Sequence, residues 1–134
     1  MRIHWLLISI IIGGVFVYLN NLKKFKTNFY SSLSKSQLQE EIFNILDLIL
    51  NHHSKVSNFE NTSLKNYSDL KNLIHYYISE IGNENTEVIH KLSFEFYPKG
   101  VFYELYEVNN QKIEFEKISK TLSIIYKEYL EKID

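Results

Sequence analysis

The feature that most constrains this chain is an apolar stretch at its start. From residue 3 to residue 22 the sequence has no acidic residue, no lysine and no arginine, and most positions are large apolar or aromatic residues. At a rise of about 1.5 Å per residue, a helix over these positions is about 30 Å long, which matches the hydrocarbon core of a bilayer. The stretch therefore predicts a transmembrane anchor over residues 1–22.

The composition of this stretch favours a retained anchor over a cleaved signal peptide. Its apolar core ends in large residues, whereas cleavage needs small residues at that point. Trp5 and Tyr18 lie near the two ends, where amphipathic rings prefer the headgroup level. Ser9 and Gly13 form a small-xxx-small pair, which predicts a helix–helix contact and hence a homodimer through the anchor. A chance spacing in a lipid-facing helix is the alternative.

The charges that flank the anchor predict its orientation. Lys23, Lys24 and Lys26 follow it, whereas Arg2 and the amino terminus precede it. The positive-inside rule therefore favours a single-pass protein of the inner or plasma membrane with a cytoplasmic C-terminal domain, by a small margin that leaves the opposite orientation open. Residues 23–33 interleave lysines with aromatic residues, and they are expected to form a basic juxtamembrane stem against lipid headgroups.

The rest of the chain, residues 34–134, is long enough for one soluble domain with a single core. Residues 1–39 carry five cations and no acid, so the remaining residues, with ten cations against sixteen acids, are acidic by six charges. Such a domain is a poor nucleic-acid binder, because phosphate contacts need a cationic face. The chain has no cysteine, which excludes disulfides, a thiolate nucleophile and Cys-ligated zinc. The absence of alanine and the excess of lysine indicate AT-rich coding, which favours a bacterial or phage source.

A helix is expected at the start of this domain. Ser34 or Ser36 supplies its N-cap, and apolar residues at i, i+3, i+4 and i+7 predict one buried face. The residues of that face are Leu38, Ile42, Ile45, Leu46 and Ile49. His52 and His53 close the helix. A metal role for this pair is disfavoured, because adjacent helical residues point about 100° apart.

Two more helices are predicted by the same period. After a polar loop over residues 54–67, a helix runs from Ser68 to Gly82. Its expected core residues are Leu70, Leu73, Ile74, Tyr77, Ile78 and Ile81. A last helix begins at Glu116 and presents one apolar face. That face consists of Ile118, Leu122, Ile125, Tyr129 and Ile133.

Between these helices the hydrophobic period changes from helical to alternating. Residues 87–97 alternate apolar and polar side chains, which predicts a strand with one solvated face. Residues 97–100 read Tyr-Pro-Lys-Gly and fit a type I turn, so residues 101–108 are expected to return as a second strand. Residues 109–110 are both asparagine and fit a tight hairpin, which leads into a short third strand over residues 111–115.

The order of these elements predicts an α+β fold. A single N-terminal transmembrane helix is followed by helices packed on a three-stranded antiparallel β-meander, in the order α-α-β-β-β-α. The sequence has no Gly-rich phosphate loop, no His-Glu-x-x-His motif and no nucleophile elbow, so no catalytic, cofactor or metal site is expected. The remaining enzyme hypothesis is a small membrane-tethered enzyme in which Glu104 or Glu107 orients His90 as a general base, although a structural histidine is favoured.

Aromatic residues give the more informative signal. Ten tyrosines, nine phenylalanines and one tryptophan make up 15% of the chain. Strand alternation places some of them on the outer face of the predicted hairpin, beside glutamates that favour a cationic protein partner. The expected binding residues are Tyr97, Tyr103, Glu104, Tyr106 and Glu107. A solvated sheet face is the alternative.

These features together predict a membrane-anchored, non-enzymatic protein-binding domain, with the lipid bilayer and a protein as its partners. The best-fitting class is an immunity or exclusion protein that captures a toxin or an incoming element at the bilayer. Small size, an acidic domain and missing catalytic motifs favour it. The alternative is an accessory subunit of a bacterial membrane or secretion assembly, which the Ser9–Gly13 pair and the strongly apolar helix after Ser34 favour.

Overall fold

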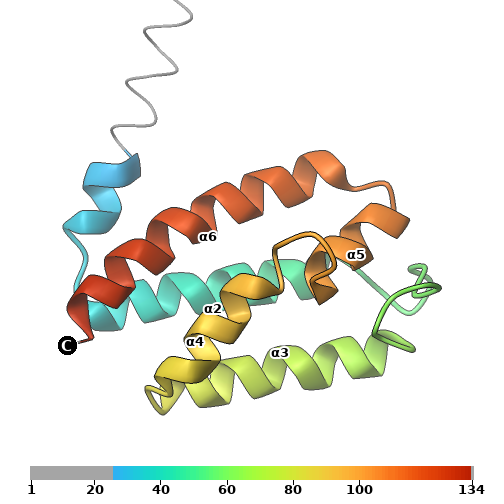
Figure 1. The fold of residues 1–134 in the computed structure, drawn as a ribbon, viewed down its shortest axis with the longest axis horizontal. Coiled ribbons are helices and arrows are strands. Elements are labelled where there is room, and N and C mark those ends of the chain that lie inside the picture. Colours follow the sequence, from blue (N-terminus) through green and yellow to red (C-terminus); the bar gives the residue numbers. More distant parts are fainter. Residues whose placement is uncertain (1–25, 134) are drawn as a thin grey trace, which may run out of the picture. The chain divides into compact units, whose positions relative to one another are not determined.

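A computed structural model of the protein describes residues 26–133, in which every regular element is a helix (Figure 1). The chain divides into two compact units, Met1–Leu33 and Ser34–Asp134. In the described part of the first unit, residues 26–31 are helical. Phe29 and Tyr30 make an edge-on ring contact there, with centroids 5.3 Å apart.

The second unit is built around one central helix. Its helices are α2 (Lys35–His52), α3 (Tyr67–Gly82), α4 (Thr86–Phe94), α5 (Val101–Val108) and α6 (Lys112–Lys132). Helix α2 packs against both α3 and α6, while α4 packs on α3 and α5 packs on α6. Figure 1 shows α3 and α6 running back along α2 on either side of it.

The predicted helix after Ser34 is confirmed, including its cap. The backbone N–H of Gln37 donates to Ser34 Oγ (3.2 Å), and the backbone N–H of Ser34 donates to Gln37 Oε1 (2.9 Å), so two N–H groups at the helix start are satisfied. All five residues predicted for its buried face are buried. Further along the helix, Gln39 Nε2 donates to the carbonyl of Ile81 (2.8 Å) and to Tyr129 Oη (3.3 Å), which joins α2 to α3 and α6.

The second and the last predicted helices of the domain, α3 and α6, are also confirmed. Asn66 caps α3 by accepting the backbone N–H of Asp69 (2.9 Å). Of the residues predicted for the core of α3, Leu73 and Ile78 are only half-buried and the other four are buried. The last helix begins at Lys112, four residues before the predicted start at Glu116.

The predicted β-meander and the α+β fold class are wrong, because residues 87–97, 101–108 and 111–115 form no strand. Their buried residues follow a helical period. In α4 and the turn after it, Val88, Ile89, Leu92 and Phe96 are buried, whereas Phe94, which alternation placed inside, is 60% exposed. In α5, Phe102, Leu105 and Tyr106 are buried at i, i+3 and i+4. A short apolar run fits either period, and the packing of α4 on α3 and of α5 on α6 favours the helical one, because it covers a helical face of each run.

The two predicted turns exist, but they connect helices. The backbone N–H of Gly100 donates to the carbonyl of Tyr97 (2.7 Å), and Lys99 has φ 73°, which is the type II rather than the predicted type I geometry. A side chain at Gly100 would collide with the backbone of Glu95, whose carbonyl accepts the N–H groups of Phe102 and Tyr103. Asn110 takes the left-handed conformation (φ 56°) and leads from α5 into α6.

Within residues 26–133, no helix has both the length and the apolar surface needed to cross a membrane. The predicted fold with a transmembrane helix and the predicted single-pass location in the inner or plasma membrane are therefore wrong. Each helix of the second unit buries one face and exposes charged residues on the other, so none is apolar all round. The predicted anchor, residues 1–22, lies outside the described residues. So do the anchor and stem residues Trp5, Ser9, Gly13, Tyr18, Lys23 and Lys24, whereas Lys26 is described and exposed.

Candidate binding cleft between α5 and α6

A cleft of about 410 Å³ opens where α5 ends and α6 begins. We call it the α5–α6 cleft. It is lined by Tyr103, Tyr106, Glu107, Asn110, Lys112, Phe115 and Glu116. Both helices are amphipathic, and the tight link at residues 109–111 brings the outer edges of their buried faces together. The cleft is therefore a product of helix packing at a tight link.

Aromatic rings form the floor of the cleft. Phe115 is 8% exposed and sits at the centre of a ring cluster. Its centroid lies 5.5 Å from Tyr103 at a near-perpendicular angle, 5.6 Å from Tyr106 and 5.8 Å from Phe96, on which it is stacked. Edge-on and offset contacts of this kind add to the free energy of burial and hold each ring in one orientation. The floor is thus an apolar surface that is fixed before any partner arrives.

Charged residues form the rim. Glu107 and Glu116 are exposed on either side of the link, and Lys112 is exposed between them. Helix α5 carries Glu104 and Glu107 and no lysine or arginine, so its surface is negative. Among the residues that line the cleft, two carboxylates therefore face one ammonium group.

A buried polar cluster supports the floor from behind. Tyr106 is fully buried, and its hydroxyl lies 2.7 Å from His52 Nδ1. Gln111 Nε2 donates to the carbonyl of His52 (3.1 Å), and the backbone N–H of Gln111 donates to the carbonyl of Tyr106 (2.9 Å). Burial, and then the charge of Glu114, raises the pKa of the Tyr106 phenol, so this group stays protonated.

His53 is the least satisfied member of this cluster. Its ring is 5% exposed and stands perpendicular to Tyr106, with centroids 4.7 Å apart. In the described structure, neither of its ring nitrogens has a hydrogen-bond partner. Burial, and then the neighbouring His52, lowers the pKa of His53 from 6.5 to about 4. The imidazole is therefore neutral at pH 7, and a proton there would be an uncompensated buried charge.

The structure brings three of the five sequence-predicted binding residues together. Tyr103, Tyr106 and Glu107 line the α5–α6 cleft, with Tyr106 as buried floor. Glu104 is half-buried on α5. Tyr97 is 56% exposed and makes an edge-on ring contact with Phe94, outside the cleft (centroids 5.6 Å apart).

Four lining residues were not predicted from the sequence: Asn110, Lys112, Phe115 and Glu116. The sequence predicts a turn, a third strand and a helix start for these positions, and that prediction does not bring them against Tyr103 and Glu107. One signal could have found them. The apolar stripe of the last helix continues backwards from Ile118 to Phe115 at a spacing of three, so the helix could have been started earlier.

The histidine of the enzyme hypothesis lies elsewhere. His90 is exposed on α4, and its Nδ1 lies 2.5 Å from the hydroxyl of Tyr126 on α6. The strand pairing that would have placed it beside Glu104 or Glu107 is absent. Within residues 26–133, no group of three or more histidine or carboxylate side chains is arranged to hold a metal ion.

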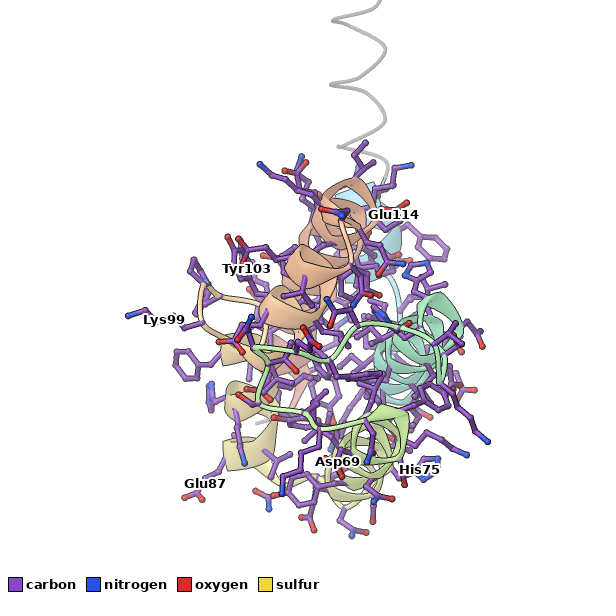
Figure 2. The ribbon with its side chains drawn as sticks, turned by 90° about the vertical axis from the view of Figure 1, so that its right-hand side faces the viewer. Asp69, His75, Glu87, Lys99, Tyr103 and Glu114 are labelled. Carbon is purple, nitrogen blue, oxygen red and sulfur yellow. The ribbon has the colours of Figure 1, made fainter. Side chains whose placement is uncertain are left out.

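A second depression, of about 560 Å³, lies at the start of α3, and we call it the α3 depression. It is lined by Lys55, Asn66, Tyr67, Ser68, Lys71, Asn72 and His75. Figure 2 places Asp69 and His75 of α3 in the lower part of the view, away from Tyr103 and Glu114 on α5 and α6 in the upper part. The two sites are therefore separate surfaces of the second unit.

Comparisons with protein-family models, with curated proteins and with solved structures found no match for this chain.

Proposed function

We propose that the second unit is a non-enzymatic protein-binding domain that captures a protein partner through the α5–α6 cleft. The observation that carries this proposal is the combination of a fixed aromatic floor with an acidic rim. Binding energy concentrates where aromatic side chains sit in well-packed pockets, and polar groups at the edge set specificity. Among the protein classes considered, immunity or exclusion proteins, which neutralise a partner by occupying its surface, fit such a domain best.

Matched tyrosines allow a direct test. Tyr103 lines the α5–α6 cleft and Tyr67 lines the α3 depression, and both side chains are half-buried. A photoreactive benzoylphenylalanine at position 103 of the full-length protein, expressed in its native cells, is expected to give one discrete adduct, identified by mass spectrometry. The same residue at position 67 is expected to give none.

The adduct should also depend on the rim. We expect the combined changes Glu107→Lys and Glu116→Lys to abolish the adduct from position 103 while the circular dichroism spectrum stays unchanged. Equal adducts from both positions, or an adduct that persists after these changes, would contradict the proposal.

A second candidate function, an accessory subunit of a bacterial assembly, is favoured by a separate observation. Tyr76, Phe94 and Tyr97 are all more than two-fifths exposed, with exposed fractions of 42%, 60% and 56%. The ammonium of Lys91 lies 5.6 Å from the ring centroid of Tyr76. Phe94 and Tyr97 contact each other, and Lys91 of α4 joins Tyr76 of α3 to the same helix, so α4 and its neighbours expose aromatic surface outside the cleft, as a subunit with two neighbours needs. An adduct from position 97 with a protein different from that at position 103 would support this candidate.

A further inference from the structure

The α5–α6 cleft has the chemistry of a site for one planar cation. We propose that it takes an arginine side chain from an exposed segment of the protein partner, with the guanidinium against Tyr103 and paired with Glu107 and Glu116. This inference rests on the proposed function and names the chemical class that the cleft recognises.

The rings of the cleft provide a surface on which a cation can stack. Tyr103 is the half-buried ring at the mouth of the cleft, and its perpendicular contact with Phe115 holds it in place. A cation over a tyrosine ring is attracted by the negative face of the π system, and the attraction grows as water leaves the site. Arginine suits this arrangement better than lysine, because guanidinium is planar, stacks on rings and is weakly hydrated.

Charge complementarity carries the second step. Both acids that line the cleft are exposed, and α5 has no cation that could neutralise them. Within residues 26–133 Lys35 pairs with Glu84, and neither rim glutamate takes part in an ion pair of this kind. Two free carboxylates beside a ring can accept the several N–H groups of one guanidinium.

Lys112 provides a specific test of the inference, because its positive charge repels a cation bound in the cleft. It lines the cleft and lies four residues before Glu116 on α6, on the same helix face. An arginine must displace it or bind beside it. Removing its charge should therefore strengthen binding, an effect that a purely structural role of the rim would not produce.

The test uses the purified full-length protein and a fluorescein-labelled glycine-serine peptide with two arginines, followed by fluorescence anisotropy. We expect the arginine peptide to bind several-fold more tightly than its lysine counterpart, and the isosteric citrulline peptide not to bind. Glu107→Lys should weaken binding about tenfold and Tyr103→Ala by a similar factor, while Lys112→Gln should strengthen it about twofold.

Glu60→Lys is the matched control. It makes the same charge change at an exposed residue of the loop before α3, where a separate shallow depression lies. Binding within twofold of the parent is expected. Equal losses in Glu60→Lys and Glu107→Lys would reveal general attraction to an acidic protein and overturn the inference, as would tight binding of the citrulline peptide.

Two further outcomes separate the possible occupants. If free arginine amide competes as well as the peptide at equal arginine concentration, the cleft serves a small molecule, and the inference of a protein segment fails. If position 103 gives a discrete adduct in cells but no arginine peptide binds, the proposed function stands and this inference alone fails. If position 103 gives no adduct and no arginine peptide binds, the proposed function and this inference both fail.

Discussion

The α5–α6 cleft and the α3 depression differ in what forms their surfaces. The α3 depression is the larger, at about 560 Å³ against about 410 Å³, but its lining side chains come from a loop and the first turns of a helix, and each of them carries a polar group. The cleft has buried rings as its floor. Apolar surface that is fixed by packing gains free energy when a partner displaces its water, whereas hydrated lysines and amides must first lose their hydration. Rigidity and chemistry, more than volume, make the cleft the stronger candidate.

The two sites also differ in charge. Lys55, Lys71 and His75 line the α3 depression without an acid, whereas Glu107 and Glu116 dominate the rim of the cleft. The lysines of the depression are exposed, and fixing a long exposed side chain costs conformational entropy. The two surfaces would therefore select partners of opposite charge, and the following predictions test whether they also differ in stability.

The largest expected effect comes from Phe115→Ala. This change removes the central ring of the cleft floor and its contacts with three other aromatic rings, so we expect unfolding to become easier by about 3–4 kcal/mol. Urea denaturation followed by circular dichroism measures the change. Tyr67→Ala in the α3 depression is the control, with an expected loss below about 1 kcal/mol. Similar losses at both sites would remove the contrast in rigidity.

The second prediction concerns acid and the buried His53 behind the cleft. Its pKa is 6.5 when exposed and about 4 in the folded protein. Between pH 6.5 and pH 4 the His53 side chain is protonated in the unfolded chain but neutral in the folded protein. The free energy of unfolding is therefore highest above pH 6.5 and falls as the pH drops towards 4. The full difference corresponds to about 3 kcal/mol, and residual screening by solvent leaves an expected loss of about 2 kcal/mol.

Paired variants isolate this contribution from the titration of the acidic residues. Urea midpoints measured from pH 7.5 to pH 4.5 should fall less steeply in His53→Phe than in the parent protein. His75→Phe, at the exposed histidine of the α3 depression, should follow the parent curve. If all three curves coincide, His53 takes up its proton in the folded state and the cluster behind the cleft is open to water.

The same contrast explains how much of the fold was predictable. The stripe from Leu38 to Ile49 covers about three helical turns, and over that length only the helical period fits. Helices α4 and α5 have nine and eight residues, and their Val, Ile, Phe and Tyr content also suits strands. Their conformation is favoured by packing of α4 on α3 and of α5 on α6, and these contacts between helices cannot be read from the short runs themselves.

The cleft was predictable only in part, and for the same reason. Composition pointed to tyrosines and glutamates between residues 97 and 107, and three of those residues line the cleft. A strand at residues 101–108 would place Tyr103 and Tyr106 on opposite faces, whereas a helix puts them three apart on one face. The missing half, Phe115 and Glu116, required the knowledge that α5 and α6 meet in a tight helical corner.

A third and smaller effect is expected at Asn109, which joins the α5–α6 link to the loop before α3. Asn109 Oδ1 accepts the backbone N–H of Asn58 (2.8 Å), and its Nδ2 donates to the carbonyls of Asn58 (2.9 Å) and Leu105 (2.8 Å). Asn109→Ala removes all three bonds at a half-buried site, so we expect a loss of about 1–1.5 kcal/mol in urea denaturation. Asn58→Ala keeps the backbone groups that Asn109 binds and should cost about half as much. A larger loss in Asn58→Ala would show that the loop, and not the α5–α6 link, holds the two regions together.

The smallest expected effect tests the α3 depression alone. Asn66 lines it and caps α3 by accepting the N–H of Asp69, so Asn66→Ala leaves that group without its partner and should cost about 0.5–1 kcal/mol. Asn66→Ser keeps an oxygen at the cap and should restore most of the loss. Because the cap lies outside the aromatic cluster, binding of the arginine peptide should be the same in both variants as in the parent protein. A change in peptide affinity that follows the state of this cap would mean that the α3 depression and the α5–α6 cleft act as one site.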